Sequence, residues 1–594
     1  MPHISENSIP LQILRRRLDS VAQIYECLSH ADPRVYLFWL PAGRSDGDGA
    51  VSTHAFELFA QAMRESHPEG TFCILTSPPD AARLIPFLQQ SLRFQLWIPV
   101  KLQTPSVDSA DALPNNHAAL LVFTRYNAVL RHTKTRVQYT YCPACGKTTK
   151  DYGGKKHVYH QYGTLVADVW RDTPIDVGRD IGPILDRLSD LFGLPPCRTL
   201  MELDLRQAAD LLPQSPVVST SAQVLAAGSR PLESRLVNDD CLRVLRDLPD
   251  DSIDFCFADP PYNLQKKYDR WNDALESIQY FEWCDQWLHE LARVLKPGRT
   301  LSVVNIPLFA ARHYQYLAPV LSYQAWIAWE ALSFPVRMIM PAHYAIVCFS
   351  KGRPRPLPGL TPTPRSKREA EALSPLAELF CLRSNCTARR NAQRPTDRAD
   401  ITDLWYDIHR LKHNSRRVDH PCQLPPRLME RLFALFTTEG DTILDCFNGA
   451  GTSTLVAQLM ARRFIGIELS TDYHQLAQER HESISRGIDP FAKNGETPKA
   501  KNSPVARLPK QQYRVSKKAL QLEVKRIATS LGRLPSREEV QELACYPVEY
   551  YDRYFISWGE VCAAARTTGM SERPSDYRAP QEQLSLSFDP AQQK

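Results

Sequence analysis

At 594 residues the chain is longer than one hydrophobic core usually supports, so we expect several domains. Hydrophobic residues make up 43% and charged residues 23%, and no apolar run reaches the ~20 residues that span a bilayer, which excludes a membrane-spanning helical protein. The net charge of +6 and the pI of about 8.5 are only mildly basic, so charge alone does not separate a nucleic-acid-binding protein from a metabolic enzyme.

The first ten residues lack the basic-then-apolar pattern of a secretory signal. We therefore expect a soluble, cytoplasmic protein without disulfides. Its 15 cysteines are expected to remain thiols in that reducing compartment.

The first motif along the chain is a short cysteine knuckle. Cys142 and Cys145 are two residues apart, and His157 and His160 follow at a spacing that completes a tetrahedral zinc site. This set predicts a structural zinc ion.

Two alternatives to this set remain open. Cys381 and Cys386 lie at the corresponding place much later in the chain, so a four-cysteine site could join the two halves of the protein. The other alternative has no metal, because the Gly- and Lys-rich loop 147–156 carries side chains that suit contact with phosphate.

A polar tetrapeptide follows the predicted buried strand 253–258. It reads Asp-Pro-Pro-Tyr, from Asp259 through Pro260 and Pro261 to Tyr262. Ligands of open α/β sheets bind outside the carboxyl ends of the strands, which places this segment where chemistry occurs. Asp259 and the Pro260 carbonyl can accept hydrogen bonds from both N–H groups of an exocyclic amine, and Tyr262 can stack on a base.

The second chemical motif is a strand, a glycine turn, a helix and a second strand. Residues 442–452 contain the strand and the turn, with Gly449 and Gly451 allowing the backbone to approach a bound nucleoside. Glu468 ends the second strand, where it can accept hydrogen bonds from ribose hydroxyls. The dinucleotide fingerprint Gly-x-Gly-x-x-Gly is absent from this segment, so phosphate binding is not the favoured interpretation.

Together these motifs resemble the DNA amino-methyltransferases of the β class, in which the catalytic tetrapeptide precedes the cofactor motif. The resemblance covers about 231–485 and includes an acidic turn at 238–241 and a His-Pro-x-Gln segment beginning at His420. It implies a Rossmann-like methyltransferase fold with a mixed, mostly parallel sheet, and S-adenosylmethionine as cofactor. By this resemblance, the cofactor-binding residues are Asp240, His420, Pro421, Asp445, Phe447, Gly449, Gly451 and Glu468.

The chain departs from the family pattern at two places. Cys446 stands where the family usually has Pro, and Leu424 stands where it usually has Lys. Neither residue removes a group that methyl transfer needs. Asp259 favours adenine as the target, since cytosine-specific relatives more often carry Ser there.

The first 205 residues weakly repeat the later half. Residues 185–192 resemble 429–436, and the segment 168–172 resembles 403–407. The strand at 35–40 corresponds to the catalytic strand but ends without an acid, and no glycine turn follows residue 205. We interpret this part as a degenerate methyltransferase copy that pairs with the active half; the alternative is the strand and helix spacing common to α/β domains.

The C-terminal part predicts a separate small domain. Helices are expected at 519–531, 536–544 and 557–566, and the segment 531–558 resembles the helical repeats attached to homing endonucleases, which are thought to bind DNA. A helical interaction domain with another role is the alternative.

The domain boundaries expected from the whole sequence are 1–230, 231–487 with a target-recognition insertion at about 354–400, a basic linker 488–516, a helical module 517–570 and a disordered tail 571–594.

The sequence thus predicts a DNA methyltransferase acting on the N6 amino group of adenine, with N4 of cytosine as the alternative. Further alternatives are a non-catalytic DNA-binding subunit and a methyltransferase for amines of RNA or protein. The expected partner is double-stranded DNA, in a restriction-modification or phage-defence setting that could include a separate restriction or defence chain. A homodimer, or a pseudo-dimer within one chain, is expected.

Overall fold

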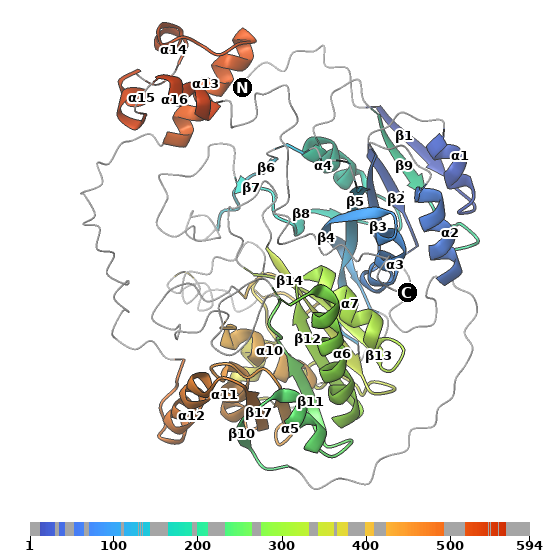
Figure 1. The fold of residues 1–594 in the computed structure, drawn as a ribbon, viewed down its shortest axis with the longest axis vertical. Coiled ribbons are helices and arrows are strands. Elements are labelled where there is room, and N and C mark those ends of the chain that lie inside the picture. The colour runs from blue at the N-terminus through green and yellow to red at the C-terminus, as the bar shows by residue number, and fades with distance from the viewer. Residues whose placement is uncertain are drawn as a thin grey trace.

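The computed structural model contains two units with a central sheet and one small helical unit (Figure 1). No helix in the described part of the chain is both long and apolar enough to cross a membrane. The described residues are 12–29, 35–41, 53–64, 70–107, 112–126, 128, 130, 132–133, 135–142, 164–192, 199–211, 232–263, 275–331, 342–361, 365–377, 386, 398–408, 423–491, 517–544, 546, 548–555 and 558–565.

The first unit has a sheet with the strand order β1-β9-β2-β3-β5-β4-β8. Neighbouring strands are parallel except around β5, which is antiparallel to both β3 and β4. Strands β2 and β3 are buried along their whole length, as expected for central strands with helices on both faces. The elements are β1 (Gln12–Arg17), α1 (Gln23–Ser29), β2 (Val35–Trp39), α2 (Thr53–Arg64), β3 (Thr71–Thr76), α3 (Pro78–Gln89), β4 (Leu92–Ser106), β5 (Asn115–Arg125), β8 (Trp170–Ile175), α4 (Gly182–Phe192) and β9 (Thr199–Asp204), with β6 (Arg136–Val137) and β7 (Thr164–Leu165) forming a separate small ladder.

The second unit has a sheet with the order β10-β17-β16-β11-β12-β14-β13-β15. It is parallel except around β14, which is antiparallel to β12 and β13. The mixed, mostly parallel sheet predicted from the sequence is therefore confirmed. The elements are β10 (Arg235–Asn238), α5 (Cys241–Asp247), β11 (Ile253–Ala258), α6 (Ser277–Val294), β12 (Leu295–Asn305), α7 (Pro307–Leu317), β13 (Ser322–Glu330), β14 (His343–Ser350), η2 (Pro358–Leu360), α8 (Lys367–Ala372), β15 (Leu404–Trp405), α10 (Pro426–Phe436), β16 (Thr442–Asp445), α11 (Thr452–Leu459), β17 (Arg463–Glu468) and α12 (Thr471–Ser485).

The two sheets repeat one strand order. Strands β1, β9, β2, β3, β5, β4 and β8 of the first match β10, β16, β11, β12, β14, β13 and β15 of the second in order and in direction. The second sheet has one strand more, because β17 lies between β10 and β16, whereas β1 pairs directly with β9. The difference between the sheets therefore falls on the segment that carries the glycine turn.

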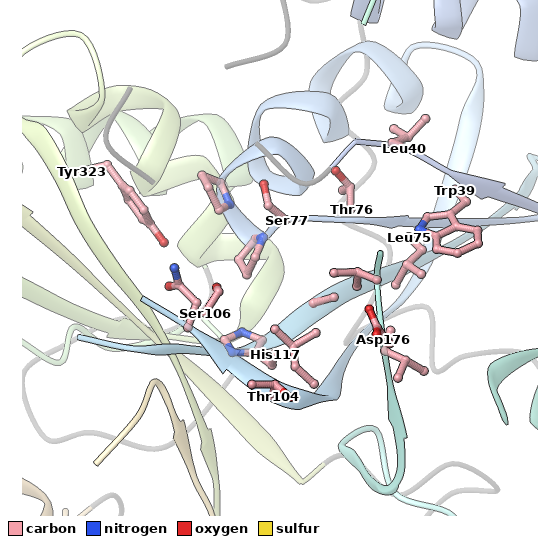
Figure 2. A pocket seen from close by; sticks show the side chains of 17 residues that line it. Trp39, Leu40, Leu75, Thr76, Ser77, Thr104, Ser106, His117, Asp176 and Tyr323 are labelled. Carbon is pink, nitrogen blue, oxygen red and sulfur yellow. The ribbon is translucent and has the colours of Figure 1, made fainter. Parts of the chain in front are cut away.

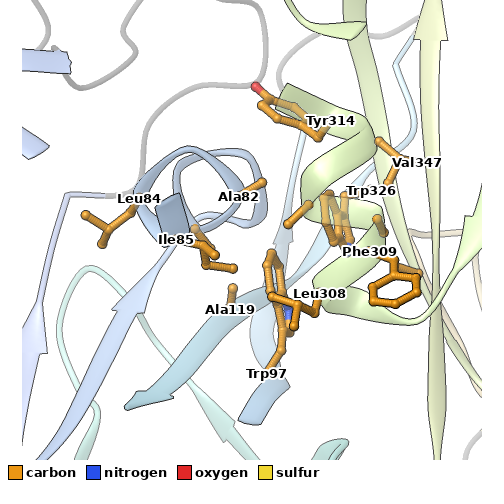
Figure 3. Close-up of a cluster of buried hydrophobic side chains, with 14 of the residues drawn as sticks. Ala82, Leu84, Ile85, Trp97, Ala119, Leu308, Phe309, Tyr314, Trp326 and Val347 are labelled. Atoms are coloured by element: carbon orange, nitrogen blue, oxygen red, sulfur yellow. The ribbon is translucent and has the colours of Figure 1, made fainter. Parts of the chain in front are cut away.

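The two units share one hydrophobic core (Figure 3). Helix α3 of the first unit packs against α7 of the second. In the same core, Trp97 of β4 and Trp326 of β13 stack with ring centroids 4.6 Å apart and planes 4° from parallel, and both side chains are buried. Gln315 Nε2 donates a hydrogen bond of 3.0 Å to the Ala82 carbonyl. A continuous apolar core of this kind makes the interface resemble that of an obligate dimer.

Each unit also places one aspartate inside the other. Asp403 Oδ2 lies 3.0 Å from His117 Nδ1, and Asp168 Oδ2 lies 3.0 Å from His343 Nδ1. The second oxygen of each carboxylate accepts a backbone N–H, from Asn116 at 2.6 Å and from Ala342 at 2.8 Å. Reciprocal contacts of this kind are the mark of a two-fold interface, here within one chain.

The helical unit has four helices in its described residues, one more than the sequence predicted. They are α13 (Lys517–Leu531), α14 (Arg537–Leu543), α15 (Val548–Tyr554) and α16 (Trp558–Ala565). The unpredicted helix α15 is rich in tyrosine and so has weak intrinsic helix propensity, and it forms because its Tyr551 is fully buried in the unit's own core.

Candidate functional site

The tetrapeptide stands at the carboxyl end of a central strand. All six residues of β11 are buried, and the strand is parallel to both β12 and β16. Phe257, near the end of β11, pairs with Asp445 at the end of β16. Asp259 therefore projects from the same edge of the sheet as the glycine turn that follows β16, as the two sequence motifs predicted.

Tyr262 is nearly buried and holds the carboxylate of Asp259. Its hydroxyl donates a hydrogen bond of 2.7 Å to Asp259 Oδ1. The Tyr262 ring lies 5.9 Å from that of Tyr344, which in turn lies 5.5 Å from the ring of Trp329. The carboxylate is thus oriented beside a row of aromatic rings.

The backbone of the tetrapeptide is fixed by residues that the sequence reasoning missed. Tyr280 donates a hydrogen bond of 2.8 Å to the Pro261 carbonyl. Asn263 has a φ of +52°, and its side-chain amide exchanges two hydrogen bonds of 2.7 Å with the backbone of Leu275. An Asn directly after the tetrapeptide was a usable signal, because Asn tolerates left-handed backbone better than most residues.

The two glycines that the sequence analysis singled out in the turn both have a left-handed backbone. Gly449 and Gly451 have φ angles of +51° and +82°, and Gly451 is the N-cap of α11. A Cβ at position 451 would lie 2.9 Å from the Cβ of Ala477. Glycine is required at 451 for two reasons, the left-handed backbone and the close approach of α12.

Asp445 organises the start of the turn. Its Oδ1 accepts a hydrogen bond of 2.9 Å from the Phe447 N–H, and its Oδ2 accepts one from the Ser453 hydroxyl. Burial raises the pKa of Asp445 to about 7, the two hydrogen bonds oppose this rise, and the nearby carboxylates of Asp259 and Glu468 add to it. Three acidic side chains therefore gather at one edge of the sheet.

Glu468 closes the turn from the neighbouring strand. Its Oε2 accepts a hydrogen bond of 2.7 Å from the Gly449 N–H, and its Oε1 accepts one of 2.8 Å from Ser470. Each carboxylate oxygen can accept a second bond, so the ribose hydroxyls of a nucleoside can still be bound. Asn448 packs against Gly466, where a Cβ would lie 2.7 Å from its side chain, and neither residue was predicted.

A pocket joins the tetrapeptide to the turn. Its wall includes Asp259 from one motif and Asp445, Phe447 and Gly449 from the other. The remaining lining residues are Phe257, Gln423, Leu424, Asn448, Ala450, Thr452 and Ser453. The structure thus brings the two motifs, far apart in the chain, into one site.

Of the remaining predicted cofactor residues, only Asp240 lies in the described part of the chain. Asp240 is the N-cap of α5, with its Oδ1 accepting the N–H groups of Leu242 and Arg243 at 2.9 and 3.3 Å. Its strand β10 pairs with β17, which ends at Glu468, so Asp240 lies on the same side of the site as Glu468. His420 and Pro421 lie outside the described residues.

The predicted zinc ligands are described only in part. Cys145, His157 and His160 lie outside the described residues, and within the described ranges no three His, Cys, Asp or Glu side chains gather to hold a metal. Cys142 is buried, and its sulfur lies 3.6 Å from that of Cys386, which belongs to the second half of the chain.

A second pocket lies in the first unit, at the carboxyl ends of β2 and β3 (Figure 2). Ser77 and the two prolines after it line this pocket, and Ser77 is the N-cap of α3, where it accepts the Asp80 N–H. The Ser-Pro-Pro-Asp segment is therefore a helix cap.

Two segments of the chain match family models. Residues 253–479 match the N6/N4-type model described as DNA methylase, and residues 515–565 match the model described as homing endonuclease associated repeat. The second match covers α13 to α16.

Similar curated proteins are methyltransferases. Type II methyltransferase M.BamHI of Bacillus amyloliquefaciens is 32% identical over 40% of this chain and 54% of its own length. Type II methyltransferase M.HpaI of Haemophilus parainfluenzae is 29% identical over 43% of this chain and 77% of its own length. The chain thus spans about half the length of the first relative.

Among solved structures, a DNA modification methylase from Thermus thermophilus, complexed with S-adenosyl-L-methionine, is similar. It shares 23% identity over 43% of this chain and 96% of its own, with a TM-score of 0.30.

Proposed function

We propose that this chain methylates an exocyclic amino group of a base in DNA, with S-adenosylmethionine as the donor, because residues 253–479 match the DNA methylase model. The observation that carries the proposal is the pocket whose wall contains both Asp259 and the glycine turn. Both the amine acceptor and the nucleoside-binding turn are needed for methyl transfer. Their meeting at one sheet edge argues against a non-catalytic subunit.

The residues of the second unit fit the cofactor. Gly449 and Gly451 keep the turn free of side chains, Phe447 offers a ring beside it, and Glu468 and Asp240 offer carboxylate oxygens to polar groups of the nucleoside. When bound, S-adenosylmethionine supplies an electrophilic methyl group.

The chain's own residues activate the amine. One N–H donates to the Asp259 carboxylate, which the Tyr262 hydroxyl orients from 2.7 Å, and the other N–H donates to the Pro260 carbonyl. These bonds would leave the nitrogen lone pair free toward the methyl group that bound S-adenosylmethionine would supply. The methylated cation then loses one N–H proton, and Asp259 is the acceptor in place.

We favour adenine over cytosine because position 259 is Asp. The family model covers both N6 and N4 enzymes, so cytosine is the alternative. The match of 515–565 to a homing endonuclease repeat supports DNA over RNA or protein as the substrate. A cytoplasmic restriction-modification or defence role, with a separate partner chain, fits this substrate.

We further propose that Cys142 and Cys386 bind a structural zinc ion that joins the two halves. Their sulfurs are 3.6 Å apart, close to the ~3.8 Å between sulfurs that share zinc at ~2.3 Å and far from the ~2.05 Å of a disulfide. Cys145 and Cys381, the other members of the four-cysteine set expected from the sequence, lie outside the described residues. Elemental analysis of the full-length protein should find one zinc per chain, lost in Cys142→Ser but kept in Cys562→Ser; metal-free wild type would refute the site.

The function is tested with purified protein, duplex DNA and S-adenosylmethionine, followed by mass spectrometry of the nucleosides. Methyl on the adenine amino group supports the favoured proposal, and methyl on the cytosine amino group moves it to the alternative. No methyl on a varied set of DNAs, with RNA and protein also tested, would overturn it.

A further inference from the structure

The first unit contains the larger of the two pockets described above, although the second unit carries the chemical motifs. This cavity has a volume of about 360 Å³, within the range of ~300–1,000 Å³ typical of small-molecule sites. Figure 2 shows its walls, which come from the ends of β2, β3 and β8, from β4 and β5, and from Tyr323 of the second unit.

The cavity lies at the place that corresponds to the methylation site. Strands β2 and β3 match β11 and β12 in sheet order, and the cavity lies at the carboxyl ends of β2 and β3 as Asp259 lies at the end of β11. Strand β2 ends at Trp39 and the chain continues with Leu40 and Pro41, so no carboxylate stands where Asp259 follows β11. Since β1 pairs directly with β9, the first sheet also lacks a counterpart of β17, whose Glu468 closes the cofactor turn.

The cavity has one buried hydrogen-bonding group that is left unused. His117 lines it, and the His117 side chain is completely buried. The Asp403 carboxylate lies 3.0 Å from Nδ1, and a neutral imidazole with its proton on that nitrogen presents Nε2 as an acceptor. Neither ring nitrogen of His117 makes a hydrogen bond within the described residues, and a buried acceptor in this state favours a ligand with an N–H donor.

The walls suit a flat aromatic ligand. Trp39 and Tyr323 line the cavity from two different units, and the Arg206 guanidinium lies 3.5 Å from the centre of the Trp39 ring, which fixes the indole. Thr104 and Ser106 add hydroxyls. Aromatic rings with a few polar groups are the usual surroundings of an unstacked base.

We infer that this cavity is a nucleobase pocket without catalytic activity, which receives a base of the bound DNA while the second unit methylates another. The inference rests on the proposed function only for the source of the base. The carboxylate of Asp176 lines the cavity from the end of β8 and accepts the Gly178 N–H at 2.8 Å. Because the first unit has no carboxylate at the end of β2 and no cofactor turn after β9, the pocket binds its base without methylating it.

The test uses full-length protein, saturated with S-adenosylhomocysteine so that the cofactor site is occupied. The probe is a single-stranded oligonucleotide with one 2-aminopurine, whose fluorescence reports on stacking. Thr104→Phe adds a ring at the wall of the cavity, whereas Gln103→Phe adds the same ring at the neighbouring residue, which is also exposed but does not line the cavity. We expect Thr104→Phe to weaken binding of the 2-aminopurine at least tenfold and Gln103→Phe to change it less than twofold.

His117→Phe removes the acceptor but keeps a ring of similar size. A tenfold loss of affinity for 2-aminopurine is expected, with the fluorescence of the bound probe also changed. Equal affinities in wild type, Thr104→Phe and His117→Phe would overturn the inference.

The result is separable from the methylation assay. If wild type does not methylate DNA but Thr104→Phe still releases the 2-aminopurine, the proposed function fails and the pocket stands. If Asp259→Ala abolishes methylation while Thr104→Phe leaves base binding unchanged, the function stands and the pocket fails.

Discussion

The ends of β2 and β11 differ in chemistry although their sheets share one strand order. Strand β11 leads into Asp259 and Tyr262, whereas β2 leads into Leu40 and Pro41. After β16 the chain forms a glycine turn, a helix and β17, and β17 then pairs with β16. In the first sheet β9 has no such neighbour and pairs directly with β1. The comparison teaches that the sheet provides only a scaffold, and that chemistry depends on a few residues where strands end.

The sharpest test of this difference is Asp259→Ala. Removing the carboxylate makes the second unit resemble the first at this position, and we expect methylation to fall about 1,000-fold or more. Radiolabelled methyl transfer to DNA measures the effect. Asp250→Ala, at an exposed carboxylate outside the site, is the control and should retain full activity. Substantial methylation by the Asp259 variant would contradict the assigned role.

The interface between the units is tested by Trp97→Ala. The variant loses a buried ring stacked on Trp326 and leaves a cavity, so the free energy of unfolding should fall by about 3–5 kcal/mol. Urea titration followed by circular dichroism measures it. Trp97→Phe keeps part of the stacking and should lose less. A variant as stable as wild type would show that the shared core does not hold the units together.

The glycine turn is tested against a glycine with the same backbone. Gly451 and Gly487 have φ angles of +82° and +78°, but only a Cβ at 451 meets a neighbour, at 2.9 Å. Gly487→Ala should cost about 1–2 kcal/mol from backbone strain, and Gly451→Ala should cost more. Calorimetry should show that Gly451→Ala binds S-adenosylmethionine more weakly than wild type, whereas Gly487→Ala binds it as tightly as wild type. Equal affinities in the two variants would separate the turn from the cofactor.

The smallest expected effect is on the pH dependence of stability. Burial raises the pKa of Asp445 in the folded protein to about 7, so the folded state holds a proton that the unfolded chain has released. Its contribution to stability is therefore present at low pH and is lost as the pH rises from about 4 through 7. Asp445→Asn should flatten this slope when Tm is measured from about pH 4 to 8. Parallel curves for the two proteins would show that Asp445 is ionised throughout.

Both chemical motifs could be found from the sequence because each is local. A strand, a turn and its glycines are adjacent in the chain, and the φ angles of Gly449 and Gly451 agree with the interpretation. The supports of the site were missed because they come from other elements, as Tyr280 does, or because they carry no distinctive pattern, as Ser453 does. The predicted roles of the site residues remain predictions that the variants above test.

By itself, the sequence determined the class of the second unit and the order of its motifs, since residue type and spacing along the chain specify strand ends and turns. Only the tertiary structure decided which distant groups meet. His117 with Asp403, and Cys142 with Cys386, are brought together by the packing of one unit on the other. No spacing in the chain encodes those pairs, because they follow from the close packing of complementary surfaces that are far apart in sequence.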